Sequence, residues 1–115
     1  VVEDAIKFVK REVKRGNKYN GIILDPPAYG RGPEGEKWLL TEHINELLKL
    51  CSSLLADKSS FFILNLYSIG FSALIANNLV NKIFNNIQDM EYGELYLPDK
   101  AGNKLPLGVF ARFAH

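Results

Sequence analysis

A carboxylate and two prolines follow a short apolar run in the first quarter of the chain. The run Gly-Ile-Ile-Leu at residues 21–24 predicts a strand buried on both faces, as in a parallel sheet. Pro26 and Pro27 lack an N–H and fix φ, so the strand ends at Asp25 with carbonyls that the ladder does not use. Ligands of open α/β sheets bind outside the carboxyl ends of strands. These groups can therefore accept hydrogen bonds from a ligand.

Other reactive side chains have simpler structural interpretations. Cys51 falls on the apolar stripe of a predicted helix, which favours a small buried hydrophobe over a nucleophilic thiol. His43 has no His or Cys at metal-ligand spacing, so we expect no metal site. The segment 30–35 contains three glycines, which favours a loop that approaches a ligand or moves as a lid. No Gly-Lys-Ser/Thr follows it, so it is not a phosphate-binding loop. Trp38, just beyond, could stack on a base or anchor this loop against the next helix, and the anchor is the simpler interpretation.

The composition is that of one globular domain or part of one. The chain has 115 residues, of which 47% are hydrophobic and 23% charged, and its net charge of +1 gives no overall footprint for nucleic acid. The basic residues between Lys7 and Lys18 are interpreted as a solvated helix face rather than a phosphate-binding surface. The single cysteine fits a reducing compartment, and no apolar stretch is long enough to span a bilayer. We therefore expect a cytoplasmic protein without a membrane partner.

Hydrophobic periodicity predicts alternating helices and strands around the Asp-Pro-Pro turn. The predicted helices cover residues 5–15, residues 41–56 and a segment that begins after an N-cap at Ser72. The predicted strands after residues 21–24 cover residues 61–66, 94–97 and 108–113, the last two joined by the turn-rich residues 98–103. The fold class is therefore α/β, with parallel strands joined by a helical crossover and closed by an antiparallel hairpin.

Asp25-Pro26-Pro27 with the nearby Tyr29 resembles motif IV of the class I S-adenosylmethionine-dependent methyltransferases. The longer run 25–33, with Gly35-Glu36 and Trp38 after it, is similar to a branch near the bacterial ribosomal-RNA cytosine methyltransferases. The resemblance implies the C-terminal half of a Rossmann-like methyltransferase sheet. It makes residues 1–115 a partial catalytic domain that lacks the upstream cofactor-binding half.

The resemblance also implies a place for the cofactor, S-adenosylmethionine. Residues 1–4 are interpreted as the tail of a strand, and Asp4 matches an acidic residue at the end of that strand that faces the cofactor's adenine, with Ala5 offering a backbone N–H. Asp25 lies next to the cofactor in the same comparison. Asp4 is equally well explained as the N-cap of the following helix, and the two roles are compatible.

For the substrate, the resemblance implies that Asp25 and the Pro26 carbonyl accept amine hydrogens while Tyr29 stacks on an extruded base. Pro27 completes this catalytic motif. The remaining substrate-binding candidates are Arg31, Asn65 and Tyr67.

The sequence departs from cytosine carbon-5 methyltransferases at their nucleophilic cysteine. Ser68 occupies the candidate position after the second strand, and Ala28 follows Pro27. Without a thiolate the resemblance points to a nitrogen or oxygen atom of RNA, most simply ribosomal RNA. Two alternatives stay open: a non-catalytic RNA-binding or interaction domain on a decayed methyltransferase fold, and a different Rossmann-like nucleotide-dependent transferase.

We expect the 115-residue chain alone to have little or no methyltransferase activity. The glycine loop and the ribose-binding acid of this fold come from strands that precede the matched region, so half of the cofactor pocket is missing. Transfer of labelled methyl groups to bulk RNA by the isolated chain measures this, and clear methylation would contradict the expectation.

Overall fold

The computed structural model describes residues 4–32, 34–35, 37–67 and 70–115 of the chain. Its elements, in chain order, are α1 (Ala5–Lys14), β1 (Gly21–Leu24), β2 (Tyr29–Arg31), β3 (Lys37–Leu39), α2 (Leu40–Leu54), β4 (Phe61–Leu66), α3 (Ala73–Ile83), β5 (Gln88–Pro98) and β6 (Lys104–Ala114). Of the strand tail expected at residues 1–4, only Asp4 is among the described residues, and the position of Ser68 lies outside them. None of the described helices has the length and hydrophobicity of a membrane-spanning helix.

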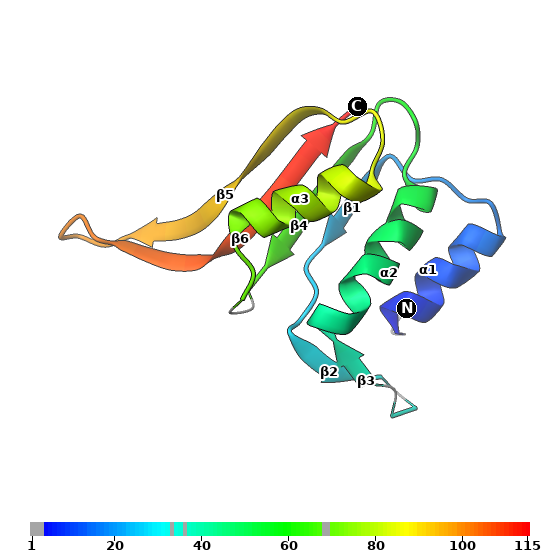
Figure 1. Cartoon of the computed structure of the whole chain (residues 1–115), viewed down its shortest axis with the longest axis horizontal. Helices are drawn as coiled ribbons and strands as arrows, with labels where there is room; N and C mark the ends of the chain where they lie inside the picture. Colours follow the sequence, from blue (N-terminus) through cyan, green and yellow to red (C-terminus); the bar gives the residue numbers. More distant parts are fainter. Residues whose placement is uncertain (1–3, 33, 36, 68–69) are drawn as a thin grey trace.

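Four strands form the main sheet in the order β1-β4-β6-β5 (Figure 1). β1 and β4 are parallel, with Leu24 opposite Leu64, and α2 lies in the crossover between them. β6 runs antiparallel to both β4 and β5, so the last hairpin closes the sheet. The predicted α/β architecture is therefore confirmed, including the parallel pair and the terminal hairpin.

One face of the sheet carries the core. Alternate residues of β4 and β6, such as Phe62, Leu64 and Ala111, are buried in a single cluster with the apolar sides of α2 and α3. Figure 1 shows α3 crossing in front of the sheet, with α2 and α1 beside each other at its β1 end. The period-2 strands and the apolar helix stripes thus face each other, which is the packing that their patterns predict.

The prediction that β1 is buried on both faces is wrong. Ile22 and Leu24 pack against the core, but the Ile23 side chain between them is 66% exposed. The physical reason is position: β1 is the edge strand of the described sheet, and no described helix covers the face to which Ile23 points. Gly21, at the start of the strand, lies under the Phe61 ring, and a Cβ there would lie 2.4 Å from Phe61 Cζ.

Only the start of the loop predicted at residues 30–35 is regular structure: Gly30 and Arg31 belong to β2, whereas residues 34–35 lie in a turn. β2 and β3 pair antiparallel, with Gly30 opposite Trp38, and form a separate two-stranded sheet directly before α2. Strands of three residues are too short to produce a recognisable alternation in the sequence. The hairpin was therefore not predicted.

The terminal hairpin is longer than its sequence pattern indicated. The predicted strands at residues 94–97 and 108–113 extend to 88–98 and 104–114. Before Val109, residues 104–108 of β6 pair with β5 alone, so this part is a two-stranded ribbon that projects from the body (Figure 1). An exposed ribbon does not need one apolar face, and the alternation that marks half-buried strands is therefore weak there.

A buried carboxylate fixes the connection from α1 to β1. Glu12 is only 5% exposed, and it accepts hydrogen bonds from the Tyr19 hydroxyl and from Asn17 Nδ2 at 3.1 Å. Arg15 Nη1 lies 3.3 Å from the same carboxylate. These hydrogen bonds, that from Tyr19 above all, lower the pKa of Glu12 below its ordinary value. The lowered pKa means that the folded state favours the ionised carboxylate.

We predict that Tyr19→Phe and Glu12→Gln both lower the free energy of unfolding at pH 7. Because the pKa of Glu12 is lowered on folding, its contribution to the free energy of unfolding is complete above the ordinary pKa of a glutamate and is lost as the pH falls through the lowered pKa of the folded state. Glu12→Gln should therefore show a shallower loss of stability than wild type as the pH falls between these two pKa values. Urea unfolding at several pH values measures it, and parallel curves for the two proteins would contradict the role of Glu12.

Candidate functional site

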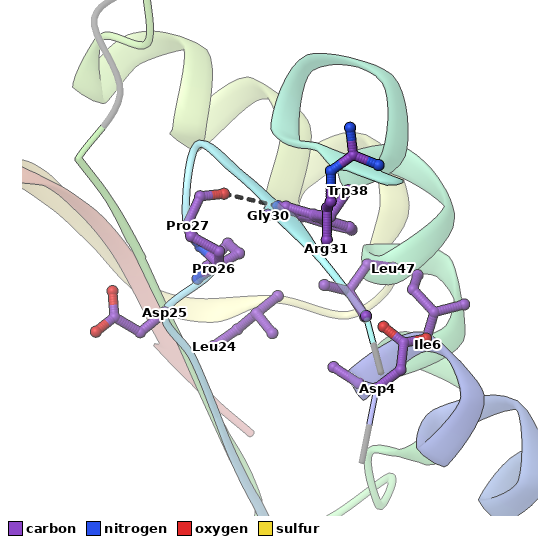
Figure 2. Close-up of a pocket in the computed structure, with 12 residues that line it drawn as sticks. Asp4, Ile6, Leu24, Asp25, Pro26, Pro27, Gly30, Arg31, Trp38 and Leu47 are labelled. Atoms are coloured by element: carbon purple, nitrogen blue, oxygen red, sulfur yellow. Dashed lines mark hydrogen bonds between the residues drawn. The ribbon is translucent and has the colours of Figure 1, made fainter. Parts of the chain in front are cut away.

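A pocket of about 390 Å³ lies at the carboxyl end of β1, against the start of α1 and the β2–β3 hairpin. Its lining is Asp4, Ala5, Ile6, Leu24, Asp25, Pro26, Pro27, Gly30, Arg31, Gly32, Trp38 and Leu47. Figure 2 shows Asp25 on one side of this pocket and Asp4 with Ile6 on the other. The structure thus brings together six of the nine residues predicted for the site, although they come from three separate segments.

Asp4 begins α1 and faces the pocket at the same time. Its Oδ2 accepts a hydrogen bond from the backbone N–H of Lys7 at 3.1 Å, which confirms the N-cap interpretation. Ala5 follows in the first turn, where the helix itself supplies no acceptor for its N–H. The Asp4 carboxylate and the Ala5 backbone N–H, which is not used by the helix, therefore lie next to each other at one end of the pocket.

The Asp-Pro-Pro turn forms the opposite end. Pro26 is buried, and the Pro27 carbonyl accepts a hydrogen bond from Trp38 Nε1 at 2.7 Å. Among the described residues, the Pro26 carbonyl has no such partner. Figure 2 shows the Asp25 carboxylate pointing away from Asp4, at the strand end. Of the two prolyl carbonyls, the first is therefore the one left for a ligand.

Trp38 is held on both sides, which confirms its anchoring role. Its ring stacks on His43 with centroids 5.4 Å apart, and His43 Nδ1 lies 2.9 Å from the backbone nitrogen of Leu39. The backbone N–H of Leu40 donates to the Ala28 carbonyl at 2.9 Å. The β2–β3 hairpin therefore ties the start of α2 to the Asp-Pro-Pro turn, a connection that the sequence did not reveal.

Three predicted residues lie outside this pocket. Tyr29 is on β2 with a side chain 77% exposed. Asn65 is half-buried on β4, one position after Leu64, as Asp25 is one position after Leu24. Tyr67 lines a different pocket at the end of β4. Arg31 does line the first pocket, but as an exposed side chain of β2.

The apolar walls of the pocket were not predicted as site residues. Ile6, Leu24 and Leu47 belong to the apolar sides of α1, β1 and α2. Their helical and strand spacing marked them as core residues, and only their nearness to the carboxyl end of β1 makes them part of a site. Which apolar residues lie near the end of β1 can be told from the sequence only after the topology is known.

The remaining candidates take structural places. Cys51 is 2% exposed, and burial raises its pKa to about 11, which confirms the interpretation as a buried hydrophobe. Lys7 Nζ pairs with Glu34 at 2.7 Å and Lys10 Nζ with Glu46 at 3.0 Å, in agreement with a solvated basic face. The described residues contain no group of three side chains able to hold a metal ion.

Comparison with known proteins bears on the fold. No family model and no curated protein matches the chain by sequence. Over 97% of its length it superposes on an S-adenosylmethionine-dependent methyltransferase from Agrobacterium tumefaciens, with a TM-score of 0.89 and 33% identity. The chain has a methyltransferase fold. A similar structure is SMU.776, described as a candidate methyltransferase and complexed with S-adenosylhomocysteine, with a TM-score of 0.69 and 21% identity over 99% of this chain. Another is a candidate S-adenosylmethionine-dependent methyltransferase from Streptococcus mutans, with a TM-score of 0.67 and 19% identity over 99% of this chain.

This methyltransferase-fold chain spans only part of each match. It covers 38% of the Agrobacterium protein, 31% of SMU.776 and 30% of the Streptococcus mutans protein. The superposition therefore confirms a partial Rossmann-like methyltransferase sheet closed by an antiparallel hairpin.

We predict that Trp38→Phe lowers the free energy of unfolding by about 1 kcal/mol, since phenylalanine keeps an aromatic ring beside His43 but leaves the Pro27 carbonyl without its donor. Tyr29→Phe, at a far more exposed aromatic of the same hairpin, is the matched control and should change little. Urea unfolding gives both values. Equal stability of Trp38→Phe and wild type would show that this hydrogen bond does not hold the turn.

Proposed function

We propose that the chain is the second part of the catalytic domain of an S-adenosylmethionine-dependent methyltransferase, whose cofactor pocket is completed by the segment that precedes it in a longer protein. The observation that carries this proposal is the convergence of Asp4, Ala5 and the Asp25-Pro26-Pro27 turn on one pocket. The similarity to the Agrobacterium enzyme over 97% of the chain supports it.

The residues of the pocket fit the adenine end of this cofactor. Ile6, Leu24 and Leu47 supply apolar surface for a flat ring, and the volume of about 390 Å³ lies in the range of small-molecule sites. Asp4 can accept a hydrogen from an exocyclic amine, and the Ala5 N–H can donate to a ring nitrogen. Both groups are placed by the start of α1, so their positions relative to the apolar walls are fixed by a helix.

The Asp-Pro-Pro turn orients the acceptor. When bound, the cofactor supplies an electrophilic methyl group on a sulfonium, so alignment matters more than acid or base strength. Asp25 and the Pro26 carbonyl each accept a hydrogen bond from the substrate group that receives the methyl, and these bonds direct its lone pair toward the cofactor. Trp38 Nε1 donates to the Pro27 carbonyl, so that carbonyl is already paired. The prolines therefore leave one defined acceptor carbonyl beside one carboxylate.

The acceptor in this proposal is a nitrogen or oxygen atom of an RNA base, most simply in ribosomal RNA in the cytoplasm. The similarity of residues 25–33 to the ribosomal-RNA branch supports an RNA substrate. Cys51 is the one cysteine of the sequence and lies in the core with a raised pKa, so this chain contributes no thiolate for attack on a cytosine ring. The chain's own residues thus favour direct transfer over covalent chemistry.

Calorimetric titration of S-adenosylhomocysteine into the full-length protein tests the cofactor assignment. Asp4→Ala removes both the N-cap and the adenine acceptor, whereas Asp4→Ser keeps a capping hydroxyl but shortens the side chain. We expect Asp4→Ser to fold as wild type does and to bind about tenfold more weakly, the loss that follows removal of a hydrogen bond to a charged group. Asp57→Ala, at an exposed aspartate outside the pocket, is the control.

Two results would contradict the proposal. Equal affinity of Asp4→Ser and wild type would remove the adenine contact. No binding by a folded wild-type protein would instead favour the non-catalytic RNA-binding domain on a decayed methyltransferase fold.

A further inference from the structure

The projecting ribbon of the terminal hairpin, residues 95–108, lies at the same edge of the sheet as the candidate site. Leu66, at the carboxyl end of β4, pairs with Val109 of β6. Because β6 is antiparallel to β4, residues 104–108 and their partners on β5 extend past that carboxyl end (Figure 1). A strand segment of this length spans roughly 15 Å, and β6 lies two strand positions, roughly 10 Å, from β1. A large substrate that reaches Asp25 over this edge therefore meets the ribbon.

The turn at the tip of the ribbon is held by Asp99. Its Oδ1 accepts hydrogen bonds from the backbone N–H groups of Ala101 at 2.9 Å and Asn103 at 2.8 Å, and its Oδ2 accepts one from Asn103 Nδ2 at 3.1 Å. The Asp99 N–H donates to the Asn103 carbonyl at 2.8 Å. The hydrogen bonds from Asn103, above all, lower the pKa of Asp99 below its ordinary value. The shape of the ribbon is therefore fixed before a partner binds, and both oxygens of this carboxylate are used within the turn.

The ribbon also carries two accessible cations and an aromatic ring. Residues 95–108 contain Lys100 and Lys104 against a single acid, Asp99. Lys100 is exposed and makes no hydrogen bond or ion pair with any described residue. Lys104 Nζ lies 4.9 Å from the centre of the Tyr96 ring, and the Tyr96 side chain is 47% exposed. Cations beside an exposed aromatic ring are the groups with which proteins hold single-stranded nucleic acid, because the cations contact phosphates and the ring stacks on a base.

We infer that the ribbon is an arm that holds the RNA substrate beside the nucleotide to be methylated, with Lys100 and Lys104 on phosphates and Tyr96 stacked on an unpaired flanking base. This inference rests on the proposed function, because RNA reaches this edge of the sheet as the methyl acceptor. Contacts of this kind do not depend on base identity, so the ribbon positions the RNA and does not select its sequence. Among the described residues, none of 95–108 lines the candidate cofactor pocket, so the ribbon changes RNA affinity and leaves cofactor affinity unchanged.

The opposite face of the ribbon offers a competing partner. Leu97 and Leu105 pair across the two strands and are 55% and 59% exposed. Successive strand residues point to opposite faces, so these leucines lie on the face away from Tyr96 and Lys104. A second copy of the chain docked on the leucines would leave the lysines and Tyr96 uncovered. Substitutions on the two faces therefore separate an RNA arm from a contact between copies.

Fluorescence anisotropy with the full-length protein and a labelled single-stranded RNA of mixed sequence tests the inference, at several salt concentrations. Lys100→Gln should reduce the slope of log affinity against log salt by about 0.7, the value for one phosphate contact on a single strand. Tyr96→Ala should weaken binding about fivefold or more, and Tyr96→Phe, which keeps the ring, should recover most of that loss. The matched controls are Lys58→Gln, at an exposed lysine before β4 on the opposite edge of the sheet, and Tyr92→Ala, at a tyrosine of β5 that is also 47% exposed. Both controls should bind RNA as wild type does.

An unaltered salt slope in Lys100→Gln, or unaltered RNA binding by Tyr96→Ala, would overturn the inference. So would a wild-type dimer in sedimentation that Leu97→Ser converts to a monomer while the lysine and tyrosine variants bind RNA normally, because the ribbon would then be a contact between copies. Titration with S-adenosylhomocysteine separates the two proposals. A wild type that binds it while the ribbon variants leave RNA binding unchanged loses only the arm. A wild type that does not bind it loses the proposed function, and the ribbon then has no methylation target to lie beside, even if its variants weaken RNA binding.

Discussion

The parallel pairing of β1 with β4 is the interaction on which the rest of the structure depends. Its register places Leu24 opposite Leu64, so the two strands end at one edge of the sheet. Parallel strands require a crossover, and α2 provides it while its apolar side covers the strands with Leu47, Leu48 and Cys51. Residues that lie far apart in the sequence, among them Asp4, Asp25 and Trp38, meet at this edge only because that pairing holds. The candidate site is therefore a product of the sheet topology rather than of any local motif.

A turn with two prolines cannot be fixed by ladder hydrogen bonds, so other contacts must hold it. The β2–β3 hairpin does so from the side, through Trp38 Nε1 on the Pro27 carbonyl and the Leu40 N–H on the Ala28 carbonyl. Trp38 is in turn held by His43 at the start of α2. The rigidity of the site thus derives from the helix behind it. This arrangement suits a reaction that depends on alignment, because the aligning groups lie on regular elements.

Elements marked by a regular apolar spacing or by a capping residue were predicted from the sequence alone. β4 was predicted with its observed bounds because Phe62, Leu64 and Leu66 alternate on the core face, and Ser72 was identified as the N-cap that the structure shows. The exposure of Ile23 could not be predicted, since it depends on what lies beside and above an edge strand. The three-residue strands of the hairpin gave no periodicity. Asp4 and Asp25 could be placed at one site only through the family resemblance, because their meeting depends on how α1 packs on α2 and β1.

The exposed edge of β1 has a consequence for the behaviour of the chain in isolation. A groove of about 270 Å³ runs along this edge between Phe8 and Val9 of α1 and the strand itself. Within residues 21–24 there is no proline or charged side chain, the devices by which proteins block strand addition. The N–H and C=O groups on this side form an unblocked template, and Ile23 adds apolar surface beside it. In isolation this edge is therefore open to pairing with a strand of a second copy.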